Sequence, residues 1–164
     1  MLVIICIWYN YKRKWGDIMN NGYGQQIVST KANTLYALSK VIKKSKIEKM
    51  YILPVAEFEN NRENVLRDIT ETYSGEQIIV RSSSSKEDSF KTSNAGHYES
   101  ILGINSGDSE QVNSAIEKVI ASYQKDIEIL DHEQILVQRQ AQNVKFSGVI
   151  FTRDIQGNRP YYLS

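Results

Sequence analysis

The segment 78–102 constrains the fold more than any other part of the chain. It begins with a short β-branched apolar run, Ile78–Val80, which is typical of a buried strand. The sequence predicts that this strand ends at Arg81 and delivers its guanidinium, with the four serines that follow, into a loop. Arginine presents a fixed fork of donors that suits phosphate, and hydroxyls and backbone N–H groups can line an anion site. The residues alone therefore leave two readings open, an anion-binding loop or an ordinary Ser-rich surface loop.

Length and charge narrow the class of protein. The chain has 164 residues, enough for one domain with a sizeable core. Its formal net charge is only +1, which gives no reason to expect a nucleic-acid partner. Cys6 is the one cysteine, so no internal disulfide forms, which fits a reducing cytoplasm. No Cys/His set has zinc spacing.

Residues 1–18 differ in character from the rest of the chain. The apolar run at the start is shorter than the ~20 residues of a membrane span, and the features of a signal peptide are missing. An interfacial membrane anchor is one interpretation. We prefer a start codon assigned too early, with Met19 as the true start. The chain then divides into an extra segment, 1–18, and one domain, 19–164, with no membrane partner.

The remaining patterns predict an α+β domain, a mixed and mainly antiparallel sheet with three packed helices. Helices are expected over 31–44, capped by Ser29 or Thr30, over 61–73, ended by Gly75, and after Asp108, which has capping-box spacing to Gln111. The stripe of the last helix consists of Val112, Ile116, Val119, Ile120 and Tyr123. Strands are expected over 50–54, 78–80, 98–102, 135–141, 146–154 and 161–163, with 135–141 and 146–154 joined as a hairpin through 142–145.

Lys31 stands in the first turn of the expected helix 31–44. A cation there opposes the helix dipole, at a cost of ~0.3–1 kcal/mol. Beside free N–H groups it would be a ready phosphate clamp, while an ordinary solvated lysine explains the residue as well. The lysines between residues 40 and 49 make a basic patch without interleaved aromatics, and we interpret it as a solvated helix face.

The sequence of segment 80–102 resembles the signature motif of a known family. It reads V-R-S-S-S-x-x-E-D-S-x-x-x-S-x-A-G-x-Y-E-S-x-L. It is similar to the N-terminal, ATP-grasp-like nucleotide-binding domain of the phosphoenolpyruvate synthase and pyruvate phosphate dikinase family. S-T-K-A-x-T-L around Lys31 resembles the family's G-x-K-A-x-x-L, with Ser29 in place of glycine. V-Q-R-Q-A and S-G-V-I-F-T-R-D resemble V-Q-x-M-V and G-V-x-F-T-x-D-P, with Gln140 in place of methionine and Ile155 in place of proline.

The resemblance implies an ATP site. It places Lys31, Arg81 and the turn Ser93-Asn94-Ala95-Gly96 at the phosphates, and Gln138 with Arg139 at the hinge strand under adenine. A side chain at Gly96 would hold backbone N–H groups away from the terminal phosphate. Glu87 and Asp88 are expected to fix the loop, and no residue is assigned a catalytic role. Mg²⁺ is expected for the family, but its Glu and Gln ligands follow beyond the matched motifs and none is identified here.

The family transfers a phosphoryl group from ATP to a histidine on a separate domain, and then to pyruvate or another acceptor. The acceptor motif G-G-x-x-S-H is not found, and neither His97 nor His132 is expected to replace it. We expect the first part of a cytoplasmic enzyme's ATP-binding domain, a truncated, split or excised product. It should be inactive without its C-terminal partner portion. The alternative is a non-catalytic remnant or partner-binding module that keeps the fold.

Overall fold

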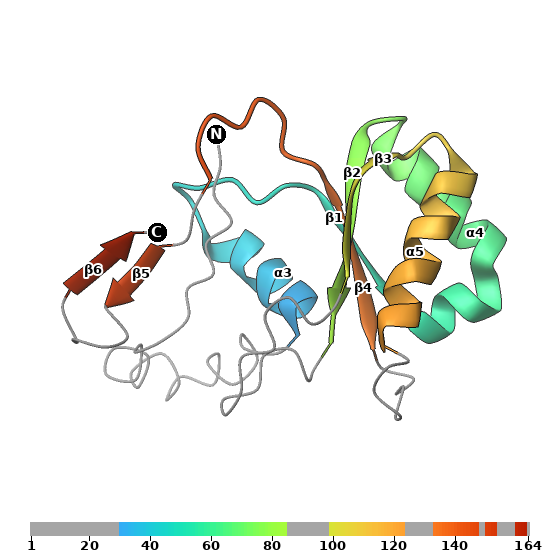
Figure 1. Cartoon of the computed structure of the whole chain (residues 1–164), viewed down its shortest axis with the longest axis horizontal. Helices are drawn as coiled ribbons and strands as arrows, with labels where there is room; N and C mark the ends of the chain where they lie inside the picture. The colour runs from blue at the N-terminus through green and yellow to red at the C-terminus, as the bar shows by residue number, and fades with distance from the viewer. Residues whose placement is uncertain (1–29, 85–98, 124–132, 148–149, 154–159, 164) are drawn as a thin grey trace.

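The computed structural model describes residues 30–84, 99–123, 133–147, 150–153 and 160–163. Helices and strands keep the labels of Figure 1. In chain order they are α3 (Lys31–Val41), β1 (Met50–Pro54), α4 (Val55–Tyr73), β2 (Gln77–Ser83), β3 (Ser100–Asn105), α5 (Ser109–Tyr123), β4 (Gln134–Arg139), β5 (Ile150–Arg153) and β6 (Pro160–Leu163).

The centre of the fold is a four-stranded sheet with the order β1-β4-β2-β3. All three of its strand pairs are antiparallel. Helices α4 and α5 cover one face of this sheet, and α3 lies against the other (Figure 1). The predicted fold class, an α+β domain with packed helices and a mainly antiparallel sheet, is confirmed. Among the described helices, none has both the length and the apolar character needed to cross a bilayer.

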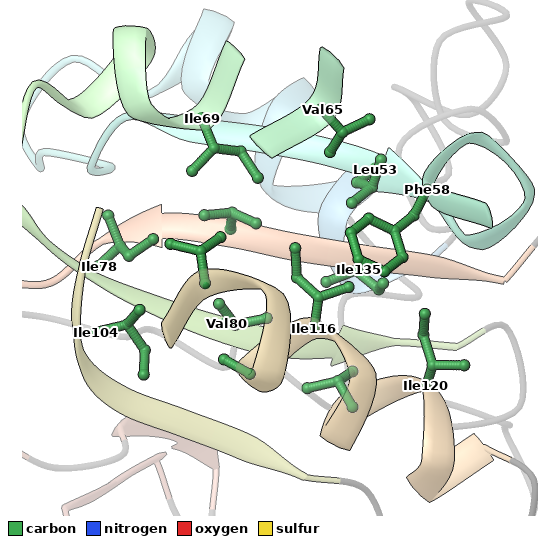
Figure 2. Close-up of a cluster of buried hydrophobic side chains, with 14 of the residues drawn as sticks. Leu53, Phe58, Val65, Ile69, Ile78, Val80, Ile104, Ile116, Ile120 and Ile135 are labelled. Atoms are coloured by element: carbon green, nitrogen blue, oxygen red, sulfur yellow. The ribbon is translucent and has the colours of Figure 1, made fainter. Parts of the chain in front are cut away.

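The hydrophobic core fills the space between the sheet and the α4–α5 layer. Figure 2 shows Phe58, Val65 and Ile69 of α4 and Ile116 and Ile120 of α5 pointing toward the strands. Side chains alternate between the two faces of a strand, so every second residue of β2 enters this core, including the buried Ile78 and Val80. The stripe predicted for α5 is confirmed, because all five of its residues are buried.

Helix boundaries differ from the predicted ones at two places. α3 ends at Val41 rather than at residue 44. α4 begins at Val55, six residues before the predicted start, with Pro54 as its N-cap residue. The chain bends at Asn61, whose φ of −133° and ψ of 35° are not helical. This bend interrupts the 3.6-residue period, so the sequence showed only the longer part of the helix after it.

The start of α5 agrees with the prediction. The Asp108 carboxylate accepts hydrogen bonds from the backbone N–H groups of Glu110, at 3.1 Å, and Gln111, at 3.0 Å. The Gln111 amide also donates to the Asp108 carboxylate at 2.8 Å. These bonds satisfy donors that the first turn of a helix otherwise leaves open.

β2 is longer than predicted, and the expectation that it ends at Arg81 is wrong. Arg81, Ser82 and Ser83 continue the ladder with β4, opposite Leu136, Ile135 and Gln134. Backbone pairing with a central strand outweighs the weak strand propensity of serine, because propensity depends strongly on the neighbours in the sheet. Arg81 and the first serines are therefore held in a rigid strand.

The hairpin predicted between 135–141 and 146–154 is also wrong. β4 lies between β1 and β2, so both of its edges are already paired. β5 pairs instead with β6, antiparallel, in a second sheet of two strands. A strand can form ladders on two sides only, and partners brought in from residues 50–54 and 77–83 occupy them.

The core explains how the domain should respond to truncation of a side chain. Ile116 is 0 % exposed, and we expect Ile116→Ala to lower the free energy of unfolding by about 2–5 kcal/mol through lost burial and a cavity. Leu102, 62 % exposed, is the matched control, and Leu102→Ala should cost about 0.5 kcal/mol or less. Urea unfolding followed by circular dichroism measures both. Equal losses in the two variants would contradict the location of the core.

The buried hydroxyl of Tyr73 predicts a loss of stability in alkali. It donates to the Val137 carbonyl at 2.9 Å, and burial is the main cause that raises its pKa well above the usual 10.0. The folded chain therefore keeps this proton while the unfolded chain loses it above about pH 10, so stability falls as the pH rises past that value. Burial, with Asp68 and Glu57, also raises the pKa of Tyr51.

Tyr73→Phe removes one of these two groups. Its free energy of unfolding should fall less steeply between about pH 10 and 11.5 than that of the native chain. Urea titrations at a series of pH values measure the two slopes. Parallel curves for the variant and the native chain would show that Tyr73 ionises alike in the folded and unfolded states.

Candidate functional site

Arg81 faces the α3 side of the sheet. Its neighbour Val80 belongs to the core under α4 and α5, and side chains alternate along the strand. Ser83, two residues beyond Arg81, confirms the direction, because its Oγ accepts a hydrogen bond from the backbone N–H of Ala32 in α3 at 2.8 Å. The guanidinium of Arg81 and the first turn of α3 therefore lie on the same side of the central strands.

Lys31 lies against β2 at the residue next to Arg81. Its Nζ donates to the Ser82 carbonyl at 3.4 Å, across a sequence separation of 51 residues. The two cations that the sequence singled out are thus on one face of the sheet, not on opposite sides of the domain. Two positive side chains on one face of a sheet form a surface suited to an anion.

Arg81 has an unsatisfied donor. Its Nε is buried and meets no hydrogen-bond acceptor in the described part of the chain. Leaving a buried donor unpaired costs roughly 1–3 kcal/mol, and more for a charged group. A phosphate oxygen on the α3 face would satisfy this donor with a charge-assisted hydrogen bond.

The N–H groups of the first turn of α3 serve the fold. Ala32 N–H is bound by Ser83, and Asn33 N–H donates to the side chain of the N-cap residue Thr30 at 3.3 Å. The predicted cap at Thr30 is confirmed. The expectation of free N–H groups beside Lys31 does not hold for Ala32 and Asn33. The N–H groups of Ala32 and Asn33 are thus not available for a phosphate, whereas the Lys31 side chain brings a charge to this turn.

The serines after Arg81 have a structural role. Ser82, Ser83 and Ser84 are all buried, and the expectation that they extend into a loop as a row of open hydroxyls is wrong for these three. Ser83 instead fastens α3 to β2. A buried hydroxyl needs a hydrogen-bond partner, and Ser83 finds it in the backbone of another element.

Gln138 and Arg139 point to opposite faces of β4. Gln138 has the same parity as Gln134, whose side chain contacts α3 by accepting from the Thr30 hydroxyl at 2.6 Å. Arg139 has the opposite parity, and its Nε donates to the Glu76 carboxylate at 2.7 Å. Only Gln138 of this pair shares a face with Lys31 and Arg81.

The other predicted site residues cannot be placed in the same way. The turn Ser93, Asn94, Ala95 and Gly96 lies outside the described residues. So do Glu87, Asp88 and the two histidines, His97 and His132.

Sequence reasoning missed a polar contact of Tyr123, which reaches β2 and β4 from α5 on the opposite face. Tyr123 was expected only as a core residue, yet its hydroxyl accepts from the Ser83 N–H at 2.7 Å and donates to the Gln134 carbonyl at 2.5 Å. A tyrosine at the end of an otherwise aliphatic buried stripe is the available signal, because a buried tyrosine hydroxyl usually has a partner.

Acidic and histidine side chains do not gather into a cluster in the described residues. No three His, Cys, Asp or Glu side chains in this part of the chain gather so that they could hold an ion. Mg²⁺ needs several oxygen ligands in octahedral geometry.

A shallow depression lies elsewhere on the molecule, between β3 and α5. Ile101, Asp108, Gln111 and Lys118 contribute to its lining. It opens on the face of the sheet that α4 and α5 cover, away from the face that carries Lys31 and Arg81. Polar and charged side chains make up most of its lining, which is unlike the mainly apolar sites that hold small molecules.

A comparison with protein families matches residues 18–163 to the pyruvate phosphate dikinase AMP/ATP-binding domain. The chain belongs to this family. The match covers every described element and both cations of the α3 face, and it supports AMP or ATP as a ligand of the domain. Neither the curated proteins nor the solved structures yield a match.

Ser83 offers a test of how the candidate site is held together. Ser83→Ala leaves the buried Ala32 N–H without its acceptor, and we expect the free energy of unfolding to fall by about 1–3 kcal/mol. Ser39→Ala is the control, because that hydroxyl is exposed and bonds only within α3. It should cost about 0.5 kcal/mol or less. Urea midpoints at equal m-values compare the two variants, and an unchanged midpoint for Ser83→Ala would contradict this docking role.

Proposed function

We propose that this chain is the ATP-binding part of a dikinase-type phosphotransferase, with Lys31 and Arg81 neutralising the phosphates. Membership of the AMP/ATP-binding domain family supports ATP as the ligand. The single observation that carries the site is the contact of Lys31 Nζ with the Ser82 carbonyl, beside Arg81 on the α3 face. A triphosphate with two or more negative charges would complement these two cations.

Phosphoryl transfer asks a protein mainly for positioning and for cancellation of charge. Arg81 is suited to charge cancellation because its backbone is fixed in a paired strand. Its Nε has no acceptor among the described residues. Lys31 supplies a second, more mobile charge from the start of α3. The turn Ser93–Gly96 completes the proposal as a source of backbone N–H groups for the terminal phosphate.

For adenine, we assign the contact to Gln138. Its amide has both donor and acceptor atoms for the edge of a base, and its strand position shares the face of Lys31. The Arg139 side chain would have to leave Glu76 and the other face of the sheet to take part. It therefore belongs to the proposed site only as the neighbour of Gln138 in β4.

In the full reaction that we propose, ATP gives up a phosphoryl group to a histidine of a separate domain, which passes it to pyruvate or another acceptor. The residues of this chain bind and orient the nucleotide and offset its charge. The nucleophile, the Mg²⁺ ligands and the acceptor pocket would come from the partner portion.

A second candidate is a non-catalytic nucleotide-binding module. It is favoured by Gln140, which stands where the resembling motif has methionine. Its amide oxygen accepts from the Gly103 N–H at 2.6 Å, so this side chain ties β3 to the end of β4. A hinge fastened in this way suits a domain that holds a nucleotide without the opening and closing of a catalytic cycle.

Binding of a non-hydrolysable ATP analogue to the full chain tests the proposal. Arg81→Ala and Lys31→Ala should each weaken the affinity by about 10–100-fold, since a charge-assisted hydrogen bond contributes roughly 1.5–3 kcal/mol. Arg67→Ala is the matched control, because Arg67 is an exposed guanidinium on α4, at the opposite face, bonded to Asn64. Isothermal titration calorimetry measures all four proteins, with circular dichroism to confirm that each is folded.

Unchanged affinity in both cation variants would rule out the phosphate roles. A folded native chain that does not bind the analogue at millimolar concentration would rule out ATP binding by this chain. Adding the partner portion separates the two candidate functions. Transfer of the phosphoryl group to its histidine supports the enzyme, and binding without transfer supports the module.

A further inference from the structure

The hydroxyl of Tyr123 lies between two strands of the central sheet. It accepts from the backbone N–H of Ser83 in β2 at 2.7 Å and donates to the carbonyl of Gln134 in β4 at 2.5 Å. These two residues are register partners at one end of the β2–β4 ladder. The tyrosine comes from the last turn of α5 and is 3 % exposed, so water has little access to replace its hydroxyl.

The same two strand residues hold the first turn of α3 with their side chains. Ser83 Oγ accepts from the Ala32 N–H at 2.8 Å, and Gln134 Oε1 accepts from the Thr30 hydroxyl at 2.6 Å. Thr30 and Ala32 are the immediate neighbours of Lys31. A helix on one face of the sheet is thereby connected, through two strand ends, to the lysine on the other face.

We propose that Tyr123 is a positioning residue for Lys31, which sets where its ammonium meets the phosphates. This inference rests on the proposed function of Lys31. The Ser83 N–H and the Gln134 carbonyl are complementary, so without the hydroxyl they can pair directly by drawing together. Ser83 and Gln134 would then move, and the first turn of α3 would move with them, because the hydrogen bonds from Ala32 and Thr30 end on these residues. Tyr123 itself does not contact the nucleotide.

Tyr73 is a built-in control for the general effect of losing a buried tyrosine hydroxyl. It is also almost fully buried, and its hydroxyl also donates to a carbonyl of β4, that of Val137 at 2.9 Å. This bond lies three residues along β4 from Gln134, the Lys49 carbonyl is the second acceptor at 3.4 Å, and neither bond of the Tyr73 hydroxyl involves Ser83 or Gln134. Both Phe variants should lose similar stability, while only Tyr123→Phe should change the placement of Lys31.

The test is a double-mutant cycle on the full chain, with the affinity for a non-hydrolysable ATP analogue and for adenosine as readouts. Tyr123→Phe should weaken analogue binding about 5–10-fold and leave adenosine affinity within about twofold, since only the phosphates meet Lys31. In a Lys31→Ala background, Tyr123→Phe should have no further effect. Tyr73→Phe should keep the native affinity for both ligands.

The positioning role is overturned if Tyr123→Phe binds the analogue like the native chain, weakens both ligands equally, or adds its full effect to that of Lys31→Ala. If Lys31→Ala alone retains native affinity, the phosphate role of Lys31 in the proposed function fails, and the positioning role fails with it. If Lys31→Ala weakens binding and Tyr123→Phe does not, only the positioning role fails. Gln134→Ala, which removes the Thr30 anchor and keeps Tyr123, must give the same pattern and replaces Tyr123→Phe should that variant unfold.

Discussion

The pairing of β2 with β4 is the constraint on which the rest of this domain depends. Both strands are central in the order β1-β4-β2-β3, so their backbone groups are hydrogen-bonded to a neighbouring strand on each side. Their side chains must therefore point to one face of the sheet or to the other. One parity sends Ile78 and Val80 into the core under α4 and α5. The other parity sends Arg81 and Ser83 toward α3. A single register therefore decides both which side chains form the core and which ones face α3.

Different interactions stabilise the two faces of the sheet. On the α4–α5 face, aliphatic and aromatic side chains are removed from water, and this burial supplies most of the stabilisation. On the α3 face, hydrogen bonds take over much of that role, because only Ala32 of α3 is fully buried. A helix held by specific bonds at its first turn has a defined position there even though little of its surface is packed.

This arrangement accounts for a paradox in the sequence, a run of serines entering a buried strand. Hydroxyls in a core are unfavourable unless each finds a partner. Ser83 binds the backbone of α3, and the Tyr123 hydroxyl joins Ser83 to Gln134. Ser83 thus docks α3 to β2 beside Arg81. A hydroxyl that the sequence suggested for an anion site instead holds a helix against the sheet.

The sequence by itself determined the class of fold, the α5 stripe, the strand 50–54, the caps at Thr30 and Asp108, and the family. These features depend on hydrophobic periodicity, on capping residues or on contiguous sequence motifs. All of them can be predicted from residues that are close together in the chain. Tertiary structure alone decided that β4 pairs with β1 and β2 rather than with the next strand along the chain. It also separated Gln138 from Arg139 by strand parity and buried the serines after Arg81. Those outcomes depend on which distant segments pair with the same strand edge. The local sequence of a strand does not indicate which distant segment will pair with it.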